Sequence, residues 1–159
     1  MMLAAAPIAA TPADAQAIVG PDAAACRAGG PALLVNVTGF KNQRGRLRVN
    51  VYGSKPADFL AKGKYVRRVD VPLSGSGRMR VCVKLPKAGD YAVAVRHDAD
   101  ANGKSGWSDG GGFSRNPDIS LANLRPKYGQ VAIPVSGVKS LNVVLNYRRG
   151  LSIAPINEN

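Results

Sequence analysis

Acidic residues gather in one stretch of an otherwise basic chain, between His97 and Asp109. The 159-residue sequence contains 22 lysines and arginines against 10 aspartates and glutamates, so its formal net charge is +12. Asp98, Asp100 and Asp109 nevertheless fall within twelve residues. Carboxylates that share one loop can balance the charge of a divalent cation, so we take this stretch as a candidate metal site.

The spacing of these oxygen-bearing residues matches a calcium loop that begins at Asp98. Such loops take ligands from positions 1, 3, 5, 7 and 12, and have glycine at position 6 for a sharp bend. Gly103 falls at position 6, but Ser105 and Gly106 replace the usual apolar and ligand residues at positions 8 and 9. We therefore expect weak affinity, in the roughly 10⁻⁴–10⁻³ M range of extracellular modules. The predicted cofactor is Ca²⁺, and its predicted ligands are Asp98, Asp100, Asn102, the Lys104 carbonyl and Asp109.

The same stretch also permits a reading without metal. Asn102-Gly103 is a strong turn pair, and aspartate side chains such as those of Asp98 and Asp100 often accept hydrogen bonds from nearby amides. The sequence leaves both interpretations open, a calcium loop and a hydrogen-bonded turn.

His97 is the only histidine, and it immediately precedes the acidic residues. It could bind a metal or transfer protons, with Asp98 and Asp100 as an acid–base pair. A single histidine at the end of a strand can equally be a hydrogen-bonded structural residue. Because the chain has no second histidine and no reactive-cysteine environment, we predict that it is not an enzyme, and keep a small hydrolase around His97 as an alternative.

Trp107 is the only tryptophan, and glycines flank it at Gly106 and at 110–112. A tryptophan on a glycine-hinged loop can stack on a sugar or pack against a partner. Alternatively, Trp107 folds back over the small face formed by Ala92 and Ala94.

The basic residues are scattered, with no run longer than two. This pattern does not favour specific nucleic-acid binding, for which basic residues cluster. A large positive charge does favour anionic partners in general, such as lipid headgroups or acidic polysaccharides. Our second functional hypothesis is a binder of polyanions or lipid headgroups that uses a basic sheet face. The outward residues predicted for this face are Arg46, Arg48, Arg78 and Arg80.

Short alternating segments separated by glycine and proline predict an all-β fold, an antiparallel two-sheet sandwich of about seven strands. Segment 39–45 is predicted to be a hairpin loop. Segment 55–63 is predicted to form one or two helical turns, with Phe59 and Leu60 closing an open end of the sandwich. Segment 97–130 shows little periodicity. The predicted strands are 32–38, 46–52, 65–73, 78–85, 91–96, 131–135 and 141–148.

The first residues, 1–17, are small and apolar and end in Ala-Gln-Ala, which is typical of a signal-peptide cleavage site. They lack a basic beginning, so we predict a truncated signal. No later segment is apolar enough for the about 20 residues that span a bilayer. The remaining organisation is predicted as a lead-in (18–30), a β-sandwich domain (31–150) and a loosely attached tail (151–159).

Two cysteines, Cys26 and Cys82, follow the predicted signal. An even number in an exported chain predicts one disulfide, which favours a periplasmic or secreted protein. In the alternation of 78–85, Cys82 lies opposite the core-facing residues. The disulfide would therefore hold the lead-in against the outer face of a sheet.

Several separated motifs occur in an order that resembles a family of bacterial exported proteins, domain of unknown function 2141. They are GF…GRLRVNVY (39–52), FLAKG (59–63), VCVKLP (81–86), GDYAVAVRHD (89–98) with NGK (102–104), and GFSRNP (112–117). The resemblance covers about residues 26–153 and implies an extracytoplasmic immunoglobulin-like or transthyretin-like sandwich without an established enzymatic activity. Members commonly carry an apolar and an acidic residue after NGK, where this chain has Ser105 and Gly106.

Together these patterns predict a non-catalytic exported β-sandwich with a calcium-binding loop and a binding or structural role at the cell envelope. The expected partners are anionic envelope components.

Overall fold

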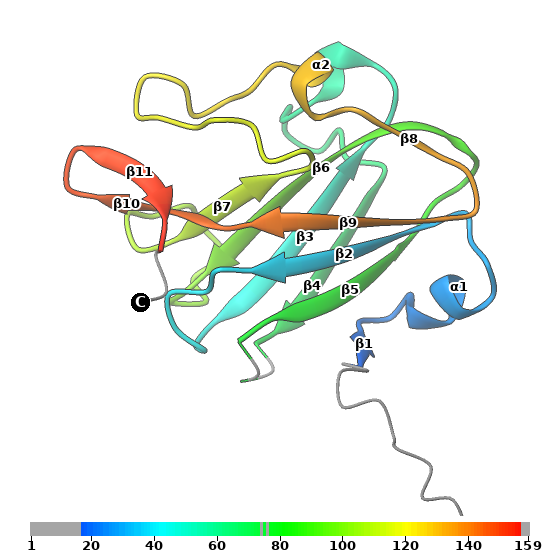
Figure 1. The fold of residues 1–159 in the computed structure, drawn as a ribbon, viewed down its shortest axis with the longest axis horizontal. Helices are drawn as coiled ribbons and strands as arrows, with labels where there is room; N and C mark the ends of the chain where they lie inside the picture. Colours follow the sequence, from blue (N-terminus) through cyan, green and yellow to red (C-terminus); the bar gives the residue numbers. More distant parts are fainter. Residues whose placement is uncertain (1–16, 74, 76, 157–159) are drawn as a thin grey trace, which may run out of the picture.

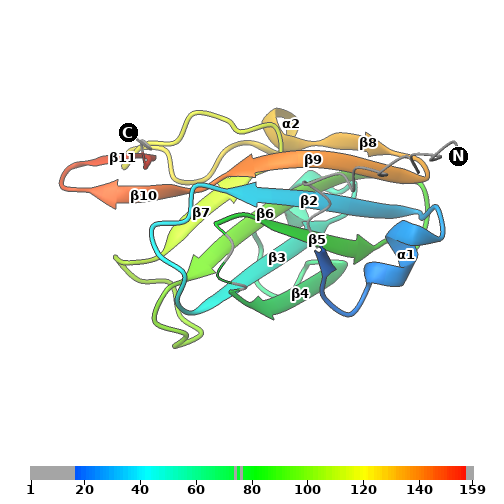
Figure 2. The ribbon, with the colours of Figure 1, turned by 60° about the horizontal axis from the view of Figure 1, so that its bottom comes forward.

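The computed structural model describes residues 17–73, 75 and 77–156. In this part of the chain, two β-sheets pack face to face as two layers (Figures 1 and 2). The predicted all-β, two-sheet sandwich is confirmed. The predicted signal at 1–17 lies outside the described residues, except for Ala17.

The smaller sheet has four strands in the order β1-β5-β2-β9. They are β1 (Ile18–Val19), β5 (Met79–Lys84), β2 (Ala32–Thr38) and β9 (Val138–Val144). β2 and β5 are antiparallel, whereas β1 runs parallel to β5 and β9 parallel to β2. The sandwich is thus mainly antiparallel with two parallel pairs.

The larger sheet has seven strands, all paired antiparallel, and most follow the order β11-β10-β7-β6-β3-β4. β8 (Ile133–Val135) pairs with the beginning of β6. The other strands are β3 (Arg46–Tyr52), β4 (Arg67–Pro72), β6 (Gly89–Asp98), β7 (Gly110–Phe113), β10 (Asn146–Arg149) and β11 (Ser152–Pro155).

Alternation along the strands builds the core between the sheets. In β3, Leu47, Val49 and Val51 are fully buried, because successive side chains of a strand point to opposite faces and these three share the inner one. β2 and β5 contribute their own alternating valines and leucines to the same cluster. The predicted core-facing positions of these strands are confirmed.

A second apolar cluster covers part of the outer face of the larger sheet. Tyr52 and Ala92 lie on this face, and Phe59 and Phe113 pack there with the short helix α2 (Tyr128–Val131). The predicted helical segment forms a 3₁₀ turn, η1 (Pro56–Asp58). Its neighbour Phe59 does not close an open end of the sandwich as expected, because the Ala-lined outer face offers it a flat apolar surface.

The lead-in is attached to the smaller sheet. Helix α1 (Ala23–Arg27) carries Cys26, which is disulfide-bonded to the fully buried Cys82 of β5. Figure 1 shows α1 beside the end of β5. The predicted disulfide is confirmed, and it covers the outer face of the sheet as its strand phase indicated.

Three details of the predicted topology are wrong. The structure has eleven strands in its described residues rather than about seven, because strands of two to four residues are too short to show periodicity. Segment 39–45 is no hairpin loop, since β2 and β3 belong to different sheets. The tail 151–159 is not loose over its described part, because β11 pairs with β10.

Candidate functional site

The acidic stretch connects β6 and β7, which form a hairpin. His97 and Gly110 are the pair nearest the loop, so residues 98–109 form the connection. Gly45 packs against the base of this loop. Its φ is +82°, and a Cβ at this position would collide with the Asp98 carbonyl. Glycine at this position therefore allows segment 39–45 to approach the loop closely.

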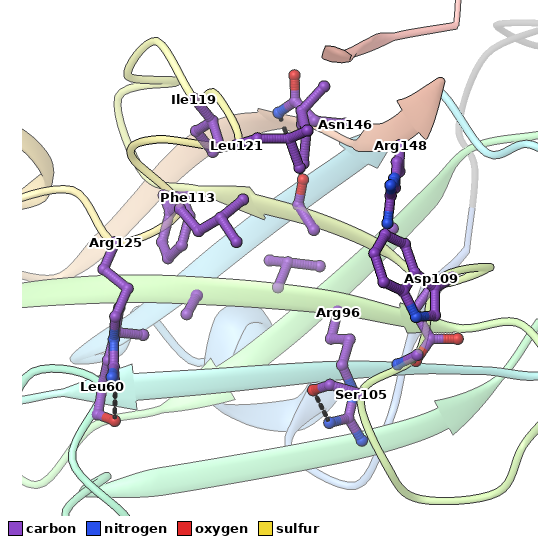
Figure 3. Close-up of a pocket in the computed structure, with 18 of the residues that line it drawn as sticks. Leu60, Arg96, Ser105, Asp109, Phe113, Ile119, Leu121, Arg125, Asn146 and Arg148 are labelled. Atoms are coloured by element: carbon purple, nitrogen blue, oxygen red, sulfur yellow. Dashed lines mark hydrogen bonds between the residues drawn. The ribbon is translucent and has the colours of Figure 1, made fainter. Parts of the chain in front are cut away.

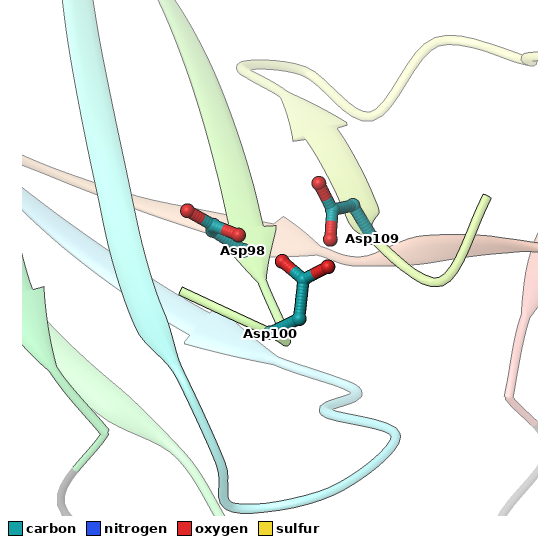
Figure 4. A group of neighbouring side chains, drawn as sticks. All are labelled: Asp98, Asp100 and Asp109. Atoms are coloured by element: carbon teal, nitrogen blue, oxygen red, sulfur yellow. The ribbon is translucent and has the colours of Figure 1, made fainter. Parts of the chain in front are cut away.

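The loop brings its three carboxyl groups together (Figure 4). One oxygen from each of Asp98, Asp100 and Asp109 lies within 4.8 Å of the other two. Asp98 is buried, with 4% of its surface exposed, while Asp109 is half-buried and Asp100 exposed. The group thus runs from the end of β6 to the solvent, as expected for a site that a cation enters from outside.

Backbone amides of the loop hold these carboxylates. Gly103 N donates to Asp98 Oδ2 (2.8 Å), and Ala99 N and Gly106 N donate to the two oxygens of Asp109 (3.2 and 3.0 Å). Gly103 has the left-handed conformation that the loop pattern requires, with φ of +77°. The predicted bend at Gly103 is confirmed.

Asp98 has an oxygen that the loop does not satisfy. Its Oδ1 is buried and has no hydrogen-bond partner in the described part of the chain. The nearest basic group, Arg96, is 4.0 Å from the other oxygen, Oδ2. Burial acts to raise the pKa of Asp98, but the Gly103 amide, a hydrogen bond shared with the Asp100 carboxyl and the Arg96 charge outweigh it and lower this pKa. An ionised, buried carboxylate with a free oxygen is a suitable ligand for a hard cation.

The other two predicted ligands are less clearly placed. The Asn102 side chain donates to Asp100 Oδ2 (2.9 Å), and its oxygen accepts from Lys104 N (2.8 Å). Asn102 therefore contacts the acidic group, but its oxygen is engaged within the loop. Arg96 holds the outer turn by donating to Ser105 Oγ (3.0 Å) and to the Gly103 carbonyl (3.1 Å).

His97 lies on the opposite, inner face of β6 and is fully buried. Its Nε2 donates to the Arg44 carbonyl (2.7 Å), and its Nδ1 pairs with the Tyr147 hydroxyl (2.6 Å). Both ring nitrogens are engaged, so His97 has the geometry of the structural alternative. Asp98 follows it on the other face of the strand, which keeps the two side chains apart.

Trp107 is 75% exposed and does not cover Ala92 and Ala94, since Phe59 and Phe113 pack in that region. The Arg148 guanidinium lies 3.1 Å from the centre of the indole ring. Trp107 also lines a cleft on the outer face of the larger sheet. Sequence patterns missed Arg96 and Arg148 at this cleft, although Arg96 shares the outward phase of Asp98.

The four predicted surface arginines do not form one face. Arg46 and Arg48 belong to β3 of the larger sheet, whereas Arg80 belongs to β5 of the smaller sheet, with Arg78 just before it. Arg48 is further engaged by Asp70 across the strand pair (2.7 Å). The prediction of a single basic sheet face is therefore wrong, because the outer faces of two packed sheets point in opposite directions.

The motifs around these residues agree with a comparison against known families. A model of an uncharacterized protein family conserved in bacteria, DUF2141, matches residues 35–142. The chain belongs to this family. The DUF2141 match includes β6, the acidic loop and β7. Comparison with curated proteins and with solved structures found no match.

No helix in the described residues is long and apolar enough to cross a membrane. The Cys26–Cys82 disulfide indicates an oxidising environment, because disulfides seldom persist in reducing compartments.

Proposed function

We propose that this protein is a non-catalytic exported binding module whose 98–109 loop takes up Ca²⁺. The observation that carries the proposal is the unpaired, buried Oδ1 of Asp98 beside two further carboxylates. A buried polar oxygen without a partner is costly, and so are adjacent like charges. A divalent cation removes both costs at once.

Calcium also suits the other groups of the loop. Oxygens of Asp98, Asp100 and Asp109 supply the charge, and the Lys104 carbonyl and the Asn102 amide oxygen complete the proposed ligand set. The Asn102 oxygen must leave Lys104 N to do so, which agrees with the weak affinity expected for this loop. Calcium tolerates flexible coordination more readily than magnesium does, so it is the better match to a strand–loop–strand connection.

Calcium titration by thermal unfolding tests the proposal. A concentration ten times the dissociation constant adds about 1.4 kcal/mol of stability, which raises Tm by roughly 3–5 °C. Asp98→Asn and Asp100→Asn should abolish the rise, whereas Asp118→Asn, at an exposed aspartate outside the loop, should retain it. No shift at several millimolar calcium, or an equal shift in Asp98→Asn, contradicts the proposal.

Terbium provides an independent readout, since Tb³⁺ replaces Ca²⁺ at oxygen sites and its emission is sensitised by a nearby indole. Trp107, the only tryptophan, lies within the loop itself. We expect Tb³⁺ luminescence that calcium displaces and that Asp98→Asn removes. Emission that calcium does not displace counts against a calcium site.

Two arguments support a non-catalytic role. Both nitrogens of His97 are engaged, so it has no free position for proton transfer. His97 is also absent from the residues that line the cleft in the described structure. A panel of ester and phosphoester substrates tests the non-catalytic role. Hydrolysis by the wild type that His97→Gln abolishes, with the fold of the variant intact, would overturn it.

The disulfide and the predicted leader support a periplasmic or secreted location, where binding or structural support at the envelope takes place. Cell fractionation with thiol alkylation tests it. We expect the protein outside the cytoplasm with both cysteines protected. A cytoplasmic protein with two alkylated thiols contradicts it.

A further inference from the structure

A cleft of about 630 Å³ lies on the outer face of the larger sheet, next to the acidic loop (Figure 3). This volume falls within the roughly 300–1,000 Å³ typical of small-molecule sites. Its floor is formed by β6, β7 and β10, and its walls by the loops that carry Trp107 and Leu121. The cleft is separate from the carboxyl group of Asp98, which does not line it.

The two ends of the cleft differ in chemistry. Figure 3 shows Arg96, Asp109 and Arg148 at one end, and Phe113 and Leu60 toward the other, where Arg125 is bound to the Leu60 carbonyl. Ile119 and Leu121 lie along one wall near Phe113, and Leu124 also lines the cleft. Leu121 and Leu124 are 39% and 50% exposed, so apolar surface faces the open cleft. An occupant with one polar end and one apolar end matches this arrangement.

The basic groups of the cleft lack close carboxylate partners in the described structure. Arg148 donates to the Gly150 carbonyl, and Arg125 to the Leu60 carbonyl (both 2.9 Å). Arg96 reaches no carboxylate oxygen closer than 4.0 Å. In contrast, Arg48 and Arg67 each bind an aspartate through two hydrogen bonds.

Two of these guanidinium groups also carry buried nitrogens without a hydrogen-bond partner, Arg96 Nε and Arg148 Nη1. The end of the cleft that carries Arg96 and Arg148 thus has two arginines against one aspartate, Asp109, while Arg125 lies toward the other end. Asp109 is itself held by the amides of Ala99 and Gly106. Charge complementarity therefore favours an anionic group at the Arg96–Arg148 end.

We propose that this cleft binds a long-chain carboxylate, with its head on Arg96 and Arg148 and its chain along Leu121 and Phe113. Arginine pairs well with a carboxylate because its planar fork donates two parallel hydrogen bonds. The apolar wall takes the chain out of water. This inference goes beyond the calcium proposal and does not depend on it.

Gly111 makes room for the ligand beside Arg96, its cross-strand neighbour. The Cβ of Gly110 would meet the Tyr147 ring and that of Gly112 would meet Val143, so both face the core. Gly111 lies between them on the outer face, where a Cβ would meet only the Val95 carbonyl at 3.7 Å. The position accepts a Cβ without collision, so a larger side chain there would extend into the cleft.

Calorimetric titration of the full protein with decanoate in EDTA tests the proposal. We expect saturable 1:1 binding that also changes Trp107 fluorescence, since Trp107 lines the cleft. Acetate tests the need for the chain and decanol the need for the charge, and we expect neither to bind comparably. Equal binding of decanol, or no saturable decanoate binding, overturns the proposal.

Matched variants locate the site. Gly111→Leu should weaken decanoate affinity at least roughly tenfold without lowering Tm, whereas Gly129→Leu, in an open position of α2, should not change it. Arg148→Gln should weaken it roughly tenfold or more, because a hydrogen bond between charged groups is lost. Leu121→Ser, on an exposed loop, provides a second test that leaves the core untouched. Unchanged affinity in Gly111→Leu and Leu121→Ser places decanoate elsewhere and overturns the proposal.

Vesicles distinguish a free carboxylate from a membrane surface. The proposal is contradicted if the protein binds anionic vesicles but shows no decanoate binding in solution. In that case decanoate does not displace the protein from the vesicles, and Gly111→Leu does not alter vesicle binding. Because all titrations are done in EDTA, their failure is distinct from a failure of calcium binding.

Discussion

Two buried aspartates at different places in the sandwich differ in how completely the chain supplies their hydrogen-bond and charge partners. Asp22, in the lead-in, is 9% exposed, and Arg67 of β4 binds both of its oxygens (2.8 and 2.6 Å). Lys84 N of β5 donates to it as well (3.0 Å). Asp98, at the end of β6, keeps one oxygen unpaired among the described residues and has further carboxylates as its neighbours.

The difference separates a structural carboxylate from one that is suited to binding. Asp22 links the edges of both sheets through a cation that the chain supplies itself. At Asp98 the chain supplies amides and further negative charge, and its nearest cation stays 4.0 Å away. Burial alone does not mark a site; what marks it is burial without a complete set of partners.

The largest expected effect on stability is at the structural carboxylate, Asp22. Asp22→Asn should lower the unfolding free energy by about 2–3 kcal/mol, because it breaks charge-assisted hydrogen bonds at a buried carboxylate. Denaturant unfolding measures this loss, which calcium should not alter. The matched control is Asp70→Asn, which breaks the Arg48–Asp70 pair at a more exposed aspartate (29% against 8% for the Asp22 side chain) and should cost less than about 1 kcal/mol. Equal losses would remove the distinction based on burial.

The stability of Asp22→Asn should also depend on acidic pH differently from that of the wild type. The Arg67 guanidinium, with the Lys84 amide, lowers the pKa of Asp22 against the effect of burial. Its stabilisation is therefore present above the unfolded-state pKa of about 4 and is lost as the pH falls through the folded value. We expect Asp22→Asn to lose less stability than wild type below about pH 4. Parallel acid profiles would show that the ion pair does not contribute.

The sequence predicts the two kinds of site unequally. The periodicity of β3, β5 and β6 is enough to assign their core faces, and the spacing from Asp98 to Asp109 is enough to bring three carboxylates together. Asp22 gave no signal, because its partner Arg67 is 45 residues away and belongs to the other sheet. The cleft was missed for a related reason: β7 consists of three glycines and a phenylalanine, so its strand shows no alternation.

Tyr147, a buried polar residue of the core, belongs with Asp22 in this comparison, because partners from the chain satisfy it. Tyr147 pairs with His97 and accepts from Lys41 N (3.2 Å), and burial raises the pKa of Tyr147 to about 12 although the Lys41 amide opposes it. Tyr147→Phe leaves the His97 ring nitrogen buried and unpaired, so we expect a loss of roughly 1–2 kcal/mol. Denaturant unfolding at neutral pH measures it.

Unfolding at alkaline pH tests whether the buried Tyr147 hydroxyl stabilises the fold in this way. Because the folded-state pKa of Tyr147 is raised, its contribution is present below about pH 10 and is lost between pH 10 and about pH 12. Stability of the wild type should fall through this window more steeply than that of Tyr147→Phe. Identical slopes would mean that the hydroxyl ionises freely in the folded protein and that His97 lacks this partner.

The smallest expected effect is the most informative one, at Asp98 itself. In EDTA, Asp98→Asn should change the unfolding free energy by less than about 0.5 kcal/mol, since the amide oxygen still accepts from Gly103 N while one of three neighbouring charges disappears. With calcium the same variant should fall behind wild type by the full binding contribution. A loss above about 2 kcal/mol in EDTA, comparable to Asp22→Asn, would show that Asp98 is already partnered within the chain, and the contrast between the two aspartates would fail.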